Sequence, residues 1–354
     1  MRPDMLLPNA LAALLAVAAA GVLGASGPAR SDFQPEFDAL LSRDLGFSSG
    51  DLADLEHGAI VRHMLTPTAP EEIGIAGAVR IRGTRQGLIA AYRDIVTFRK
   101  SAGPVLAVGR FNDPPRLSDL DSLTTTHEDV DLRGCKVGDC DIRLPSAAIE
   151  RIAGSVDWHR PDADAQASAL FKQILLTHVQ AYVTGGPGRI ERYDDGRTPI
   201  LTARSADAVI KASPFLDALK PGLAAHVQCA WSNPLEGAED FLYWSKEKFA
   251  FAPFISVTHV TIAAAGPHQT VAVNRDVYSS RYIDAAMSMM VASDAAGDRG
   301  SYYLLYVNRS RASALRGPMA ALRRAIVERK ARSSLETHLR DLKARIEAPA
   351  NSRP

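Results

Sequence analysis

The stretch "YYLLYVNRSRASALRGPMAALRRAIVERK" (residues 302–330) changes from one apolar pattern to another. Its first part is a short aromatic and aliphatic run, typical of a strand. Its second part has apolar residues at helical spacing, and the pattern recurs further on. The two sets are Leu315, Met319, Leu322 and Ile326, then Leu335, Leu339, Leu342 and Ile346. We therefore expect a strand that leads into a long closing helix, which must bury one face of a sheet.

Strand-like runs also precede this stretch, and its own first part is the last of the series. Four of them follow one another with short, turn-rich connections, which favours consecutive antiparallel pairing. They are "PFISVTHVTIA", "QTVAVNRDVYSS", "DAAMSMMVAS" and "SYYLLYVNR". Three further strands are predicted near the start, in "AIVRHML", "EIGIAGAVRIR" and "GPVLAVGRF". In the second of these, Ile73, Ile75, Val79 and Ile81 share one face, with Gly77 between them.

The middle of the chain has a helical period, which is clearest in "ADAQASALFKQILLTHVQAYV". We divide the chain into N-terminal helices with the first part of the sheet (33–144), a helical insertion (145–235), a meander with the closing helix (236–347) and a tail (348–354). The predicted fold class is α+β: a curved antiparallel sheet packed on a long C-terminal helix, with a helical insertion.

This layout resembles the helix-grip fold of START and Bet v 1-like proteins. The passage 302–330 carries most of the resemblance, and "AVRIRGTRQGLIAAYRDIVTF" (residues 78–98) resembles the opening strand and first helix of that family. The resemblance implies a ligand cavity between the sheet and the final helix. The helical insertion departs from the small members of the family. The chain is also similar to exported bacterial proteins without an assigned activity.

The N-terminal segment has the pattern of a secretory signal peptide. Arg2 precedes an apolar run from Leu11 to Leu23, and Ala25-Ser26-Gly27 offers a small-residue cleavage site. We expect residues 1–27 to be removed and the protein to be periplasmic or secreted. The alternative is an uncleaved N-terminal membrane anchor.

Two of the three cysteines lie close together in "LRGCKVGDCDIRL" (residues 132–144). Cys135 and Cys140 lack the spacing of a redox couple, a haem attachment site or a zinc site. In an oxidising compartment we expect them to form a small structural disulfide across a hairpin turn. Cys229 is then a buried free thiol, or it pairs with one of the other two.

The charge balance limits the partners. The formal net charge is +1, so no overall field attracts nucleic acid, and we expect no nucleic-acid partner. Residues 309–345, however, contain eleven Lys or Arg and three acidic residues. The simplest interpretation is a solvated helix face; the alternative is a peripheral contact with an anionic membrane.

Two polar residues stand among apolar neighbours on the predicted strands. His259 shares a face with Ile255, Val257 and Thr261, and Arg275 shares a face with Val271, Val273 and Val277. If these faces line a cavity, the two side chains would hold the polar group of an otherwise apolar ligand. Otherwise Arg275 pairs with an internal carboxylate such as Asp284, and His259 is hydrogen-bonded in the core.

Aromatic residues provide further candidate ligand contacts. In "FLYWSKEKFAFAPF" (residues 241–254), Tyr243 and Trp244 precede a predicted "SKEK" turn. The segment is interpreted as a flap over a cavity mouth or as a cluster that joins the insertion to the sheet. Tyr278 and Tyr282 fit an adaptable pocket or an ordinary core.

No standard catalytic, nucleotide-binding or metal-binding motif stands out, and we expect no cofactor and no metal. The leading hypothesis is an exported binding or carrier protein for an apolar or amphiphilic, lipid-like small molecule. The alternatives are a cyclase- or hydrolase-like enzyme on the same scaffold, with His259 as general base, and an envelope interaction protein that uses its basic C-terminal helix.

Overall fold

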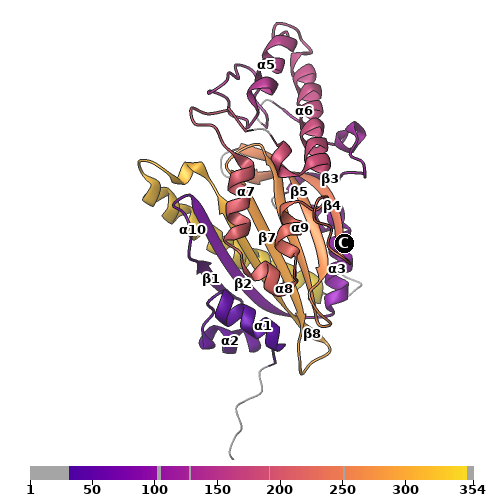
Figure 1. The fold of residues 1–354 in the computed structure, drawn as a ribbon, viewed down its shortest axis with the longest axis vertical. Helices are drawn as coiled ribbons and strands as arrows, with labels where there is room; N and C mark the ends of the chain where they lie inside the picture. The colour runs from indigo at the N-terminus through magenta and orange to yellow at the C-terminus, as the bar shows by residue number, and fades with distance from the viewer. Residues whose placement is uncertain (1–31, 102–104, 127–128, 191, 250–251, 349–354) are drawn as a thin grey trace, which may run out of the picture. The chain divides into compact units, whose positions relative to one another are not determined.

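The chain folds around one antiparallel β-sheet, which is curved and does not close into a barrel (Figure 1). The computed structural model describes residues 32–101, 105–126, 129–190, 192–249 and 252–348. The predicted signal segment 1–27 lies outside this range. The strands are β1 (Val61–Leu65), β2 (Glu72–Arg82), β3 (Val105–Arg110), β4 (Glu239–Phe249), β5 (Ala252–Ala264), β6 (Gln269–Ser279), β7 (Ala285–Asp294) and β8 (Ser301–Arg311). Their order in the sheet is β1-β2-β8-β7-β6-β5-β4-β3.

The meander from β5 to β8 pairs consecutively and antiparallel, as the short connections predict. The last strand then pairs with an early one: β8 lies beside β2, from Glu72 opposite Arg311 to Arg82 opposite Ser301. Strand β4 was not expected. The prediction of a turn at "SKEK" is wrong, because residues 245–248 continue the strand and pair with β5.

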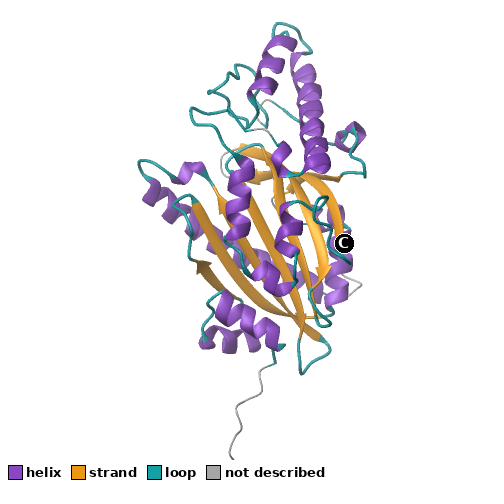
Figure 2. Ribbon diagram, in the orientation of Figure 1, coloured by secondary structure: helices purple, strands orange, loops and turns teal. Residues whose placement is uncertain are grey.

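Helices cover both faces of the sheet (Figure 2). They are α1 (Pro35–Ala39), α2 (Ser49–Glu56), α3 (Arg85–Arg93), α4 (Ile95–Lys100), α5 (Ser146–Ser155), α6 (Ala163–Gly185), α7 (Thr202–Lys211), α8 (Phe215–Leu219), α9 (Leu223–Gln228) and α10 (Ala320–Glu347). Short helical turns span Leu40–Asp44, Leu117–Leu120, Pro187–Arg189 and Ser313–Leu315. No helix in the described part of the chain is long and apolar enough to cross a membrane.

Helices α3, α4 and α10 pack on one face of the sheet. Ile75, Val79 and Ile81 of β2 are buried there, as their alternation predicts. Gly77 lies between them because a Cβ at this position would come within 2.8 Å of Leu335 and 3.0 Å of Leu339. The absence of a side chain therefore lets α10 approach the sheet closely.

The opposite face is covered by α1 and α2 and by helices of the 145–235 segment. Tyr303 and Leu305 of β8 are fully buried there among residues of α1, α2, α7, α8 and α9. Helix α6 packs with α5 and contributes to a further core that contains Trp244 and Val257. The described chain from Asp32 onward is a single compact unit, so the helical segment completes the sheet's second layer.

The closing helix differs from its predicted burial pattern. Leu335, Leu339 and Leu342 pack against the sheet as expected, whereas Met319, Leu322 and Ile326 are exposed. The helix begins at Ala320, whereas the leucines that contact the apolar part of β2 begin at Leu335. The first turns of the helix therefore lie beyond this contact. Equal spacing in the sequence therefore does not mean equal burial along this helix.

The cysteine prediction is confirmed for one pair. Cys135 and Cys140 form a disulfide across the turn in which Lys136 pairs with Asp139. The alternative pairing of Cys229 is thereby excluded, and Cys229 is a half-buried free thiol whose Sγ lies 3.2 Å from the Ser232 hydroxyl.

Candidate functional site

The α10-facing side of the sheet changes from apolar to polar along its strands. On β5, Val260 and Ile262 are apolar, whereas Ser256 and Thr258 lie further back along the same face. On β8, Leu304 is likewise followed by Asn308. The buried leucines of α10 cover the apolar part. The polar part remains hollow.

A cavity of about 240 Å³ occupies this hollow. Its walls come from α3, α4, α10, five neighbouring strands and the segment before β7. The lining residues are Tyr92, Phe98, Arg99, Tyr243, Glu247, Phe254, Ser256, Thr258, Asn274, Asp276, Ile283, Ala286, Ser288, Met290, Tyr306, Asn308 and His338. Polar groups from segments far apart in the sequence therefore converge on one cavity, which is typical of ligand sites.

An ion pair forms one side of the cavity. The Arg99 guanidinium lies 2.5 Å from a Glu247 carboxylate oxygen, and both side chains are mostly buried. Ser245 donates a second hydrogen bond to Glu247 over 2.6 Å. The Nε of Arg99 is buried and has no hydrogen-bond partner among the described residues. The Nε–H of Arg99 is therefore an available hydrogen-bond donor beside the cavity.

Asp276 is the cavity's most strongly perturbed carboxyl group. Burial and the negative charge of Glu247 raise its pKa to about 7, against the opposing effects of Arg99 and a hydrogen bond with Thr258. The carboxyl group is thus partly protonated near neutral pH and can either donate or accept a hydrogen bond. Such a shift in a cavity is a feature of functional sites.

Neutral hydroxyl and amide groups complete the polar wall. The Tyr92 hydroxyl donates to Asn274 Oδ1 over 2.5 Å, and Asn274 Nδ2 donates to Ser288 over 3.1 Å. Burial raises the pKa values of Tyr92, Tyr243 and Tyr306, so these hydroxyls stay protonated. Burial also lowers the pKa of His338, which favours its neutral form. The wall therefore offers directed hydrogen bonds besides the Arg99–Glu247 charges.

Of the aromatic residues predicted to touch ligand, Tyr243 lies in this wall and Trp244 does not. Trp244 follows Tyr243 on β4 and therefore points to the opposite face. It is fully buried, and its indole N–H donates to the Asp119 carbonyl over 2.8 Å. Since residues 241–249 belong to β4 and residues 252–254 to β5, these residues are part of the sheet and not of a flap.

His259 also lies on the face opposite α10. It is 2% exposed, its Nδ1 lies 2.8 Å from the Tyr182 hydroxyl, and its Nε2 lies 3.0 Å from Asp240. His226 Nε2 lies 3.1 Å from the same carboxylate. Burial lowers the pKa of His259, whereas the hydrogen bond with Asp240 raises that of His226 despite burial. Both ring nitrogens of His259 thus have partners within the protein.

Arg275 lies beside His259 on the same face. Its guanidinium donates to the backbone carbonyls of Val227 and Gln228, over 3.0 and 2.6 Å. The prediction that Asp284 pairs with Arg275 is wrong, because the Asp284 carboxylate lies 2.6 Å from Arg143. Arg275 therefore anchors the end of α9 to the sheet. Ligand binding by His259 and Arg275 stays a prediction.

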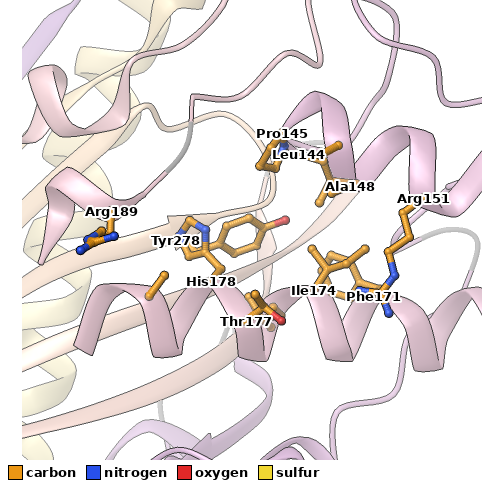
Figure 3. Close-up of a pocket in the computed structure, with 13 residues that line it drawn as sticks. Leu144, Pro145, Ala148, Arg151, Phe171, Ile174, Thr177, His178, Arg189 and Tyr278 are labelled. Carbon is orange, nitrogen blue, oxygen red and sulfur yellow. The ribbon is translucent and has the colours of Figure 1, made fainter. Parts of the chain in front are cut away.

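Tyr278 lines a second cavity of about 250 Å³, between α5, α6 and the sheet (Figure 3). Its hydroxyl donates to the Arg143 carbonyl over 3.1 Å. Phe171 and Ile174 form an apolar wall, and Arg151 also borders the space. This cavity is more apolar than the one beside α10, and it does not bring buried carboxylates together.

Tyr282 lies near the edge of the α10-side cavity. Its hydroxyl accepts a hydrogen bond from the Ala252 backbone N–H over 3.2 Å, and its ring lies edge-on to Phe254, a cavity residue. Tyr282 therefore supports the wall through Phe254.

Sequence reasoning missed Arg99, Glu247 and Asp276. A usable signal was present: Asn274 and Asp276 alternate on β6, and Ser288 and Asn308 continue the polar pattern on the strands β7 and β8. The opposite face carries the stronger sequence signal, because Arg275 lies there among valines. Whether the polar or the apolar alternate residues faced the closing helix was not visible from the sequence.

Among the described residues, no group of three or more His, Cys, Asp or Glu is arranged to hold a metal ion. The fold and site thus define an α+β protein with an open antiparallel sheet, a long closing helix and a polar cavity between them. No family model, curated protein or solved structure matches the chain.

Proposed function

We propose that this is an exported binding protein that holds a small amphiphilic molecule between the sheet and α10. The observation that carries the proposal is the α10-side cavity itself, where the packed apolar face gives way to a hollow lined by polar groups. Asp276 and the Arg99–Glu247 pair converge on this cavity beside apolar side chains, and a few convergent polar groups among apolar walls are typical of ligand sites.

The cavity walls indicate the chemistry of the ligand. Phe98, Phe254 and Met290 offer apolar contacts, while Arg99 and Asp276 offer a charge and a titrating hydrogen-bond group. The volume of about 240 Å³ lies below the range of about 300–1,000 Å³ for drug-sized ligands. The ligand is therefore a small molecule with one polar end, and a whole phospholipid does not fit.

The resemblance to helix-grip proteins is consistent with this proposal. An open curved sheet, a last strand that leads into a long packed helix, and a cavity between them all support it. The segment 145–235 is then an addition that covers the far face of the sheet. Export with a cleaved signal peptide agrees with the Cys135–Cys140 disulfide, and an N-terminal anchor would leave the same domain outside the membrane.

The test is native mass spectrometry of protein expressed with its N-terminal segment and purified without detergent. We expect a bound mass that organic extraction removes. Ala286→Trp, which fills the α10-side cavity, should abolish this mass, whereas the matched Ala147→Trp in the second cavity should retain it. A mass retained by Ala286→Trp and lost by Ala147→Trp would move the site to the second cavity. An empty wild-type protein would count against the proposal.

A second candidate function is an enzyme on the same scaffold, with Asp276 as general acid–base. The pKa of about 7 favours it, because a proton-transfer group works best when its pKa lies near the working pH. His259, the base expected from the sequence, already has both ring nitrogens hydrogen-bonded.

Turnover would separate the two candidates. The extracted compound is returned to fresh protein, and its conversion is followed by mass spectrometry across pH. Catalysis predicts a rate that changes near pH 7 and falls at least about 100-fold in Asp276→Asn. Recovery of the unchanged compound at every pH would leave binding as the function.

A further inference from the structure

The first half of α10 exposes apolar residues to solvent. Met319, just before the helix, is 64% exposed, Leu322 is 52%, Ile326 is 55% and Val327 is 40% exposed. Ile326 precedes the buried Leu335 by nine residues, about two and a half turns, so the two lie on opposite sides of the helix. We call Met319, Leu322 and Ile326 the outer stripe. It points away from the protein's own sheet.

Basic residues border the outer stripe. Arg329 follows Leu322 by seven residues and Ile326 by three, which puts it beside both, and Arg332 lies one turn further on. Arg323 donates to the backbone carbonyls of residues 316 and 318, and it forms no ion pair with the residues that the structure describes. Glu328 is the one acidic residue from 316 to 334, and it pairs with Arg324. The stripe is therefore apolar in the middle and positive around it.

This charge pattern selects among the partners that an apolar stripe could have. A second copy of the chain would bring the same positive charges against each other. An anionic lipid surface instead attracts the basic residues and accepts the apolar side chains in its acyl region.

We propose that the first half of α10 docks the protein onto anionic lipid bilayers, with the outer stripe inserted at the interface. This inference does not rest on the proposed ligand. It agrees with a protein that acts beside a membrane without spanning it. The contact is reversible, since a few apolar side chains and a few charges give weak binding that depends on salt.

The experiment is co-sedimentation of the full chain with vesicles of phosphatidylglycerol and phosphatidylcholine, compared with pure phosphatidylcholine. We expect binding to the anionic vesicles that weakens as salt is raised. Leu322→Gln/Ile326→Gln should lower the affinity at least about tenfold. The matched control Leu106→Gln/Leu117→Gln removes two exposed leucines elsewhere and should bind like the wild type.

The charges are tested separately. Arg329→Gln/Arg332→Gln should lower the affinity about 25-fold, at about fivefold per charge near the surface. Arg133→Gln/Arg160→Gln removes the same net charge from exposed sites elsewhere and should have little effect. All these side chains are exposed, so folding is checked by circular dichroism and should be unchanged.

Two results would overturn the inference. One is equal binding of the wild type and the Leu322→Gln/Ile326→Gln variant to anionic vesicles. The other is sedimentation of the wild type as a dimer and of that variant as a monomer, without vesicle binding by either, which would assign the stripe to self-association.

Discussion

Asp240 and Asp276 are two partly buried carboxyl groups on opposite faces of the sheet, and their pKa values shift in opposite directions. Burial opposes ionisation of Asp240, but hydrogen bonds with His226 and His259 hold its pKa below the usual range. Asp276 lacks comparable partners, and its pKa rises to about 7. The Asp240 carboxylate therefore stabilises the fold, whereas ionised Asp276 destabilises it. This is the pattern expected where stability is exchanged for function.

Replacing Asp276 with Asn should stabilise the protein at alkaline pH. Because the pKa rises from 3.8 to about 7 on folding, the folded chain binds a proton in this window that the unfolded chain does not. Stability therefore falls as pH rises from about 4 to 7, by up to about 4 kcal/mol. Asp276→Asn removes this loss. Urea unfolding at pH 5 and pH 8 measures it.

At pH 5 the two proteins should differ less than at pH 8, since folded Asp276 is still largely protonated and the loss comes only from ionisation of the unfolded carboxyl. The difference should grow through neutrality. An Asp276→Asn variant that is less stable than the wild type at pH 8 would mean that the ionised carboxylate has a stabilising partner.

Replacing Asp240 with Asn should have the opposite effect. The lowered pKa means that the stability contributed by the ionised carboxylate is present above about pH 4 and is lost as the pH falls. We expect Asp240→Asn to lose about 2 kcal/mol at pH 7, since it weakens charge-assisted hydrogen bonds to two histidines. The loss should shrink in acid. A constant deficit from pH 7 to pH 3 would contradict the ion-pair account.

At the scale of single elements, β2 and α10 depend on each other through Gly77. A Cβ on Gly77 would press on Leu335, Leu339 and the Val61 carbonyl. We expect Gly77→Ala to lower the free energy of unfolding by about 1–3 kcal/mol, the usual range for overpacking. Thermal and urea unfolding provide the measurement.

Gly154 provides the matched control, because it lies within α5 and a Cβ there would meet nothing within 4 Å. The same substitution at Gly154 should raise stability by about 0.5–1 kcal/mol through helix propensity. Similar losses at both positions would show that the close approach of α10 to Gly77 is not what matters.

The elements also show which sequence signals were sufficient. Alternation identified β2 and β5 to β8, from the residues that share a strand face. Strand β4 was hidden because its "SKEK" segment has the composition of a turn. Pairing with β5 and burial of Lys246, which lies 2.6 Å from Asp129, override that local preference.

At the scale of the whole molecule, the sequence predicted which elements form better than it predicted which face of the sheet each element covers. The α+β class, the consecutive meander and the closing helix are all present. The pairing of β8 with β2, and the covering of the second face by α7 to α9, depend on contacts between residues far apart in the chain. The cavity's location follows from that assignment, which is why Asp276 was overlooked in favour of its neighbour Arg275.

The Cys135–Cys140 disulfide gives a final prediction, on the global stability of the chain. The bond closes a loop of about six residues, for which chain entropy predicts about 2 kcal/mol of stabilisation. Cys135→Ser/Cys140→Ser should therefore unfold at lower urea than the wild type, and reductant should abolish the difference. Cys229→Ser keeps the bond and should respond to reductant as the wild type does. Three reactive thiols in protein recovered from the periplasm would mean that the bond does not form in that compartment.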